Sequence, residues 1–337
     1  MFHTTVPESD RKKRKGRKRM RQEKILLDTD MGTDVDDALA LIYLLKHPAC
    51  RMMGITTVAG EAGVRAELAQ TLCGECNVQV PVYPGCEQCM IIPQREVSAP
   101  HGRLLPHSGS SRQYPAGQAL SFMQQVIREN EGEITLIGIG PFTNIAMLFR
   151  MDPELPGMLK KLVLMGGRFF PDCQSIQTPQ ERHTPDRNPA FADVSIASML
   201  RGGMLEANMA TDPHAAAVIA GAAPSRTRII SLDVTREVVM KEESFRQKFA
   251  AKEYTLLMKM AQMWLQVDGQ ITFHDPLAAV SVFCPQVCTY LNGNLEIELS
   301  GGKMDGCTYL EENPGGRFEV SSQVYPETFF REYFSVI

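Results

Sequence analysis

Short apolar runs alternate with amphipathic stretches along most of the chain after residue 24. The apolar runs end in polar residues or glycine, as in "KILLD" (24–28), "EITLIGIG" (133–140) and "KLVLMGG" (161–167), which is typical of buried parallel strands. Between them, "DDALALIYLLKH" (36–47) and "GQALSFMQQVIREN" (117–130) carry apolar residues at helical spacing. This alternation predicts a mostly parallel sheet flanked by helices.

The last part of the chain shows a different pattern. "LNGNLEIELSG" (291–301) and "GRFEVSSQV" (316–324) alternate apolar and polar residues, which favours half-buried antiparallel strands. We therefore expect an open, Rossmann-like α/β sheet with a small antiparallel C-terminal addition, in one domain over 25–337. A polar, proline-rich stretch at 171–190 interrupts the rhythm, and a long loop in such a place is usually functional or mobile.

Charge is distributed unevenly over the 337 residues. Residues 1–24 carry ten Lys or Arg and three Asp or Glu, whereas the whole chain has a net charge of −4. A block of like charges such as 11–21 predicts a disordered tail, for which a nuclear signal or a nucleic-acid contact is the functional alternative. The longest apolar run, 38–45, is too short to span a membrane. We expect a cytoplasmic protein, or a nuclear one if the tail is a signal.

Nine cysteines include a CxxC…CxxC pattern at Cys73, Cys76, Cys86 and Cys89. Such a pattern can hold zinc, but the gap between the two pairs is shorter than in most zinc sites. Each cysteine also has a place in an α/β unit without a metal. The sequence therefore favours free thiols over a zinc site.

Five aspartates lie between the first predicted strand and the first predicted helix, at positions 28, 30, 34, 36 and 37. In an extended strand Asp28 and Asp30 would point to the same side, at the carboxyl end where open α/β sheets bind ligands. Asp36 and Asp37 fall at the helix start, which favours negative charge. Capping explains one or two acids but not five, and no Lys or Arg lies between residues 24 and 46. A hard divalent cation would supply the missing charge.

Two enzyme families place carboxylates in this way. "DTD" (28–30) fits the strand end of Mg²⁺-dependent, haloacid-dehalogenase-like phosphatases, although "VDDALAL" (35–41) is misplaced for that family. "DTDMGTDVDDALAL" (28–41) resembles the signature of inosine–uridine-preferring nucleoside hydrolases, with two extra residues before the acidic pair. Five further segments resemble that family, in its order: "ITTVAG" (55–60), "IGPFTNIA" (139–146), "LVLMGG" (162–167), "EANMATDPHAA" (206–216) and "FHDPLAA" (273–279).

The resemblance implies a Ca²⁺ ion held by the carboxylates of Asp30, Asp37 and Asp275 and by the backbone carbonyl of Ile139. It also implies that Asp30 is the general base that takes a proton from water, and that His274 protonates the leaving base. Protonation of the leaving base suits a group whose pKa lies near neutrality. From local sequence alone, His274 would be a structural histidine and Asp275 a helix cap.

Sugar contacts also follow from the resemblance. Asp36, Glu206 and Asn208 match residues that hold the ribose hydroxyls, although the two extra residues leave Asp34 as an alternative to Asp36. Glu61 stands where the family has an asparagine that contacts ribose, and we expect it to alter sugar recognition.

The implied function is hydrolysis of small-molecule ribonucleosides to base and ribose, in a homo-oligomer (dimer or tetramer). The phosphatase and a non-catalytic nucleoside or sugar binder on the same fold are the alternatives.

Overall fold

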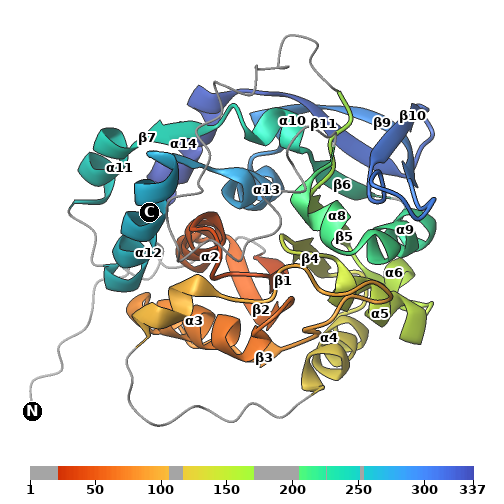
Figure 1. The fold of residues 1–337 in the computed structure, drawn as a ribbon, viewed down its shortest axis with the longest axis horizontal. Helices are drawn as coiled ribbons and strands as arrows, with labels where there is room; N and C mark the ends of the chain where they lie inside the picture. Colours follow the sequence, from red (N-terminus) through yellow and green to blue (C-terminus); the bar gives the residue numbers. More distant parts are fainter. Residues whose placement is uncertain (1–21, 106–116, 171–204, 225, 251–253) are drawn as a thin grey trace, which may run out of the picture.

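A nine-stranded sheet forms the centre of the computed structural model, which describes residues 22–105, 117–170, 205–224, 226–250 and 254–337 (Figure 1). The strand order is β10-β9-β11-β6-β5-β4-β1-β2-β3. Neighbouring strands are parallel throughout the part of the sheet that runs from β11 to β3. Strand β9 is antiparallel to both of its neighbours, β10 and β11. The predicted open, mostly parallel sheet with an antiparallel C-terminal addition is therefore confirmed. The strands are β1 (Glu23–Thr29), β2 (Cys50–Thr57), β3 (Val82–Pro84), β4 (Ile134–Gly138), β5 (Lys161–Met165), β6 (Thr227–Ile230), β9 (Cys288–Ile297), β10 (Thr308–Glu312) and β11 (Phe318–Val324).

Helices cover both faces of this sheet, because its strands are apolar on both sides. In β1, Ile25 and Leu27 belong to one buried cluster and Leu26 to the other. The first cluster involves α2 (Asp36–Lys46), α3 (Ala62–Glu75), α10 (Leu232–Thr235), α11 (Glu242–Phe249), α12 (Thr255–Asp268), α13 (His274–Phe283) and α14 (Pro326–Val336). The second involves α4 (Gln118–Glu129), α5 (Thr143–Met151), α6 (Leu155–Met158), α8 (Ala207–Thr211) and α9 (Pro213–Ala222).

Three smaller features complete the described fold. A separate antiparallel pair, β7 (Val239–Lys241) with β8 (Gln270–Thr272), leads the chain into α13. Two short 3₁₀ helices follow β3 and α13, namely η1 (Pro100–Leu104) and η4 (Pro285–Val287). The sequence pattern did not predict the β7–β8 pair, because strands of three residues are too short to show a period.

The order of the strands determines where a ligand can bind. From β1 the chain continues through β2 and β3 to one side of the sheet, and then returns to β4, β5 and β6 on the other side. The carboxyl ends of β1 and β4 therefore flank the point at which the strand order reverses. Open α/β sheets bind ligands at this topological switch point.

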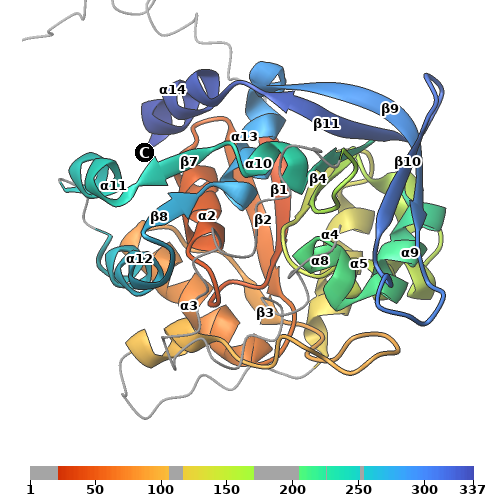
Figure 2. The same cartoon turned by 45° about the horizontal axis from the view of Figure 1, so that its top comes forward.

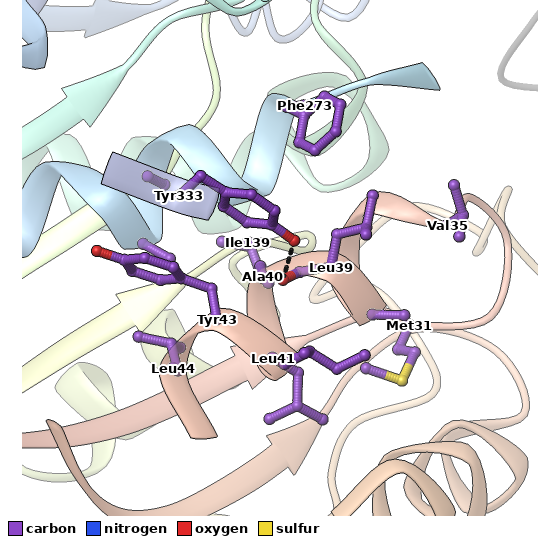
Figure 3. Packing of buried hydrophobic residues seen from close by; sticks show 14 of the residues in the cluster. Met31, Val35, Leu39, Ala40, Leu41, Tyr43, Leu44, Ile139, Phe273 and Tyr333 are labelled. Carbon is purple, nitrogen blue, oxygen red and sulfur yellow. Dashed lines mark hydrogen bonds between the residues drawn. The ribbon is translucent and has the colours of Figure 1, made fainter. Parts of the chain in front are cut away.

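Helices α2 and α13 lie side by side next to this point (Figures 1 and 2). Figure 3 shows the apolar core beneath them, in which the Tyr333 hydroxyl of α14 donates a 3.0 Å hydrogen bond to the Leu39 carbonyl of α2. Met31, Val35 and Phe273 are fully buried in this core, and each is next in sequence to a predicted site residue. Packing of these apolar residues therefore restrains the positions of their polar neighbours Asp30, Asp36 and His274.

Of the predicted basic tail over 1–24, residues 1–21 lie outside the described residues, and so does the predicted 171–190 loop. Among the described segments, none of the helices combines the length and apolar character needed to cross a lipid bilayer.

Candidate active site

The turns after β1 and β4 touch at the switch point. A side chain at Gly140 would place its Cβ atom 2.8 Å from the Asp30 backbone nitrogen and 3.0 Å from the Asp30 Cβ. The Ile139 nitrogen donates a 2.9 Å hydrogen bond to the Asp28 carbonyl. Only glycine at position 140 permits this close approach, so the structure brings Asp30 beside the Ile139–Gly140 turn.

Three buried aspartates gather beside this turn. Ligand oxygens of Asp36, Asp37 and Asp275 all lie within 4.8 Å of one another, although the acids come from the first turns of two different helices, α2 and α13. Asp36 Oδ2 accepts a 3.1 Å hydrogen bond from the Asp275 nitrogen, and Asp37 accepts one from the Thr29 hydroxyl at the end of β1. Both helix N-termini favour negative charge at this place.

Burial and mutual repulsion make these carboxylates hard to ionise. Burial, followed by the charge of Asp36, raises the pKa of Asp37 to about 8. Burial and neighbouring acids also raise the pKa values of Asp36 and Asp275 well above the ordinary range. A divalent cation between these oxygens would relieve both effects. The all-oxygen donor set fits a hard cation such as Ca²⁺ or Mg²⁺, and the structure thus contains a buried acidic cluster that could bind a metal ion.

Asp30 lies next to this triad and has a carboxylate partner of its own. Burial raises the pKa of Asp30 well above its ordinary value, and so do the charges of Glu96 and Asp37, whereas Arg65 lowers it. Glu96 also shares a side-chain hydrogen bond with Asp30 and accepts one of 2.6 Å from the Thr33 hydroxyl. The segment that precedes η1 therefore contributes an acid that the sequence analysis did not single out.

Arg65 is the positive charge that the local sequence lacks. Its side chain is fully buried in α3 and donates to Glu96 Oε1 (2.8 Å), to the Ser98 carbonyl (3.0 Å) and to the Asp30 carbonyl. It also donates to the Gly60 carbonyl at 2.8 Å. The guanidinium thus joins three turns around the acidic cluster.

Glu206 and Asn208 lie on the other side of the switch point, at the start of α8. The Glu206 carboxylate accepts backbone hydrogen bonds from Asn208 (2.9 Å), Met209 (3.0 Å) and Gly167 (2.9 Å). The Asn208 amide donates to the carbonyls of Ile139 (3.2 Å) and Met165 (3.0 Å). Glu206 is therefore the N-cap of α8, and Asn208 holds the carbonyl that was predicted to bind the cation.

His274 is the first residue of α13 and directly precedes Asp275. Its Nδ1 lies 2.7 Å from the hydroxyl of Thr235, the last residue of α10. Burial lowers the pKa of His274 to about 4, so the imidazole is neutral at pH 7.

Two other acids of the sequence analysis, Asp28 and Asp34, lie outside the triad. Asp28 does not share a side with Asp30, because β1 ends at Thr29 and the Asp28 carboxylate instead accepts hydrogen bonds from Thr56 (2.6 Å) and Asn144 (2.7 Å). Burial raises the pKa values of Asp28 to about 7 and Asp34 to about 8.

Glu61 is exposed and has a left-handed backbone (φ 58°) at the start of α3. Its Oε2 accepts a 2.7 Å hydrogen bond from the Ala99 nitrogen. Its predicted contact with the sugar stays a prediction.

The four cysteines of the CxxC pattern do not form a metal site. Among the described residues, the aspartate triad is the only group of three or more His, Cys, Asp or Glu that could hold an ion. Cys73 lies in α3, whereas Cys89 donates to the Thr211 carbonyl at 3.1 Å.

Comparison with known proteins relates this chain to nucleoside hydrolases. Residues 25–331 match the model of the inosine-uridine preferring nucleoside hydrolase family. The chain is 26% identical over 300 residues to uridine nucleosidase 1 of Arabidopsis thaliana, covering 83% of this chain and 80% of that protein. It is 34% identical over 156 residues to the pyrimidine-specific ribonucleoside hydrolase RihB of Escherichia coli, covering 44% of this chain and 49% of that protein.

Solved structures extend the likeness to the whole fold. A purine-preferring ribonucleoside hydrolase from Gardnerella vaginalis has a TM-score of 0.72 at 26% identity, covering 93% of this chain and 97% of that one. A plant nucleoside hydrolase has a TM-score of 0.74 at 21% identity, with 93% and 98% covered, which supports the fold alone. This chain is an N-glycosyl hydrolase and belongs to the inosine-uridine preferring nucleoside hydrolase family.

Proposed function

We propose that this protein hydrolyses the N-glycosidic bond of ribonucleosides with a bound Ca²⁺ ion. The observation that carries this proposal is the meeting of Asp36, Asp37 and Asp275, with Asp30 beside them, at the switch point of a nucleoside hydrolase fold. Asp30, Asp37, Asp275 and the Ile139 carbonyl would hold the ion. Several carboxylates together with a backbone carbonyl suit the six to eight oxygen ligands of Ca²⁺.

In this mechanism the chain's own groups accept a proton from water, stabilise the charge of the sugar and donate to the leaving base. When bound, the cation supplies the positive charge that acidifies a coordinated water. Asp30 would take a proton from the attacking water, and the water oxygen would form a bond to the anomeric carbon of the sugar. The bond between that carbon and the base nitrogen breaks, and its electron pair leaves with the base. Negative charge from the buried carboxylates stabilises the cationic sugar of the transition state.

The sugar and the base are recognised by different groups in this proposal. Asp36, Glu206 and Asn208 hold the ribose hydroxyls, and His274 donates to the departing base. The names of the relatives cover both pyrimidine and purine nucleosides, so uridine and inosine are the substrates to test first. A dimer or tetramer and a cytoplasmic location stay predictions.

The test is release of free base from inosine and uridine by protein stripped of divalent ions, before and after Ca²⁺ is added. We expect no release without the ion and turnover with it. Full activity in excess chelator would overturn the proposed mechanism. Binding of nucleosides without any turnover in Ca²⁺ would instead favour the non-catalytic binder, and calorimetry with inosine separates these outcomes.

A further inference from the structure

One contact of the candidate site has no role in the function proposed above. The Thr235 hydroxyl lies 2.7 Å from His274 Nδ1, and Thr235 is fully buried. Thr235 belongs to α10, which follows β6, whereas His274 follows β8. Residues from two separate segments therefore meet at this ring nitrogen.

Backbone hydrogen bonds hold the two partners in place. The Thr235 nitrogen donates to the Ser231 carbonyl at 3.1 Å, and the Val238 nitrogen donates to the Thr235 carbonyl at 3.0 Å. The Phe273 nitrogen in turn donates to the Val238 carbonyl at 2.9 Å. This series connects Thr235 to the residue before His274, and both Val238 and Phe273 are fully buried. The distance between hydroxyl and ring is thus set by the fold.

The direction of this hydrogen bond follows from the alternatives open to the hydroxyl proton. The Leu232 carbonyl is 3.5 Å from Thr235 Oγ1, which is at the limit of a hydrogen bond, whereas His274 Nδ1 at 2.7 Å has the usual distance for a hydroxyl donor. The hydroxyl is therefore best satisfied by donating to Nδ1. A neutral imidazole that accepts at Nδ1 carries its proton on Nε2.

We propose that Thr235 is a positioning residue that holds His274 in the tautomer with the proton on Nε2. In this form His274 is already a hydrogen-bond donor and does not have to take up a proton first. This inference rests on the proposed hydrolysis: the donor at Nε2 stabilises the negative charge that develops on the base as the electron pair of the glycosidic bond moves to it. Thr235 itself touches neither the sugar nor the base.

Two variants separate the hydroxyl from the shape of the side chain. Thr235→Val keeps the branched shape but removes the hydroxyl, and Thr235→Ser keeps the hydroxyl. Long-range proton–nitrogen NMR spectra of the seven histidines report the tautomer of each ring, and the signal missing in His274→Gln assigns His274. In the wild type we expect an unprotonated Nδ1 and a protonated Nε2, in Thr235→Ser the same, and in Thr235→Val averaged signals from a mixture. A proton on Nδ1 in the wild type, or unchanged ring signals in Thr235→Val, would overturn the inference.

Kinetics of the Ca²⁺-loaded enzyme give a second readout. We expect Thr235→Val to lower kcat for inosine about tenfold or more, with little change in KM, and to have much less effect on a nitrophenyl riboside, whose leaving group needs no donor. Thr235→Ser should recover most of the loss. Equal losses on both substrates would mean that the residue only supports the fold. If the wild type releases no base at all, the proposed function fails, whereas the NMR spectra still test the tautomer.

Discussion

At the residue scale, Asp37 joins the end of β1 to the candidate ion site. Its carboxylate accepts a hydrogen bond from Thr29, and its ligand oxygen lies within 4.8 Å of those of Asp36 and Asp275. Asp37→Asn removes one ligand charge, so we expect Ca²⁺ to bind at least about tenfold more weakly, or 1.4 kcal/mol, in calorimetry. Glu327→Gln, an exposed acid in the first turn of α14, is the matched control and should bind Ca²⁺ like the wild type. Equal Ca²⁺ affinity in both variants would contradict the role of Asp37 as a ligand of the ion.

His274 should matter most for substrates with poor leaving groups. We expect His274→Ala to lower kcat for inosine by roughly 10²–10⁴, the usual effect of removing an acid catalyst. The same variant should cleave a nitrophenyl riboside almost as fast as the wild type. Steady-state rates on both substrates decide the matter, and a similar loss on each would assign His274 to ion or sugar positioning instead.

Glu61 combines an unusual backbone with an unusual residue type. Its left-handed φ of 58° is better tolerated by asparagine than by glutamate, and the family resemblance predicts that its charge faces the sugar beside the acidic cluster. We expect the wild type to turn over common nucleosides poorly and Glu61→Asn to raise kcat/KM for inosine or uridine by about tenfold. Glu61→Gln removes the charge but keeps an oxygen that can accept from Ala99, which separates charge from side-chain length. An efficient wild type and no gain in either variant would place Glu61 outside the pocket.

At the scale of elements, α3 holds the turns of the site together through Arg65. The Arg65–Glu96 pair is almost completely buried, with side-chain exposures of 0% and 5%. Arg65→Met leaves the Glu96 charge unpaired, and breaking a buried pair in this way costs about 3–5 kcal/mol. Urea unfolding should show this loss, and the double variant with Glu96→Gln should recover part of it. Arg128→Met is the control, because Arg128 is 43% exposed beside Asp152 and should cost less than about 1 kcal/mol. Equal losses of stability in the two arginine variants would contradict the role of Arg65 in holding these turns together.

At the scale of the whole molecule, the buried acids couple stability to pH and to the cation. The pKa values of Asp28, Asp34 and Asp37 are raised to about 7, 8 and 8, whereas in the unfolded chain these groups are ionised above about pH 5. Between pH 6.5 and 7.5 the native state therefore binds more protons, and its free energy of unfolding falls as pH rises. The slope is up to roughly 1.4 kcal/mol per pH unit for each proton held only by the native state.

Thermal unfolding with and without Ca²⁺ measures this coupling. The metal-free protein should have a lower Tm at pH 7.5 than at pH 6.5, and Ca²⁺ should raise Tm more at pH 7.5, because the ion binds the ionised carboxylates. Below pH 6.5 the comparison is less direct, since burial lowers the pKa values of His101 to about 3 and His274 to about 4 and these histidines act in the opposite direction. A metal-free Tm that rises from pH 6.5 to 7.5 would contradict the raised carboxylate pKa values.

The sequence by itself determined the order of the elements and the location of the acids. Apolar runs and helical spacing are local properties, so they predicted β1, α2, β4 and the antiparallel end of the chain. The motifs around Asp30, Asp37 and Asp275 also placed three acids at strand ends and helix starts. These features needed no knowledge of which strands are neighbours.

Only the tertiary structure decided what these acids face. The countercharge at Arg65, the second carboxylate at Glu96 and the hydroxyl of Thr235 are ordinary residues in the sequence, and they gain meaning because α3, the turn before η1 and α10 converge on the switch point. The separation of Asp28 from Asp30 also depended on where β1 ends. Electrostatic and hydrogen-bonding partners act over a few ångströms, and distances of that kind between remote segments are set by the order in which the strands pair.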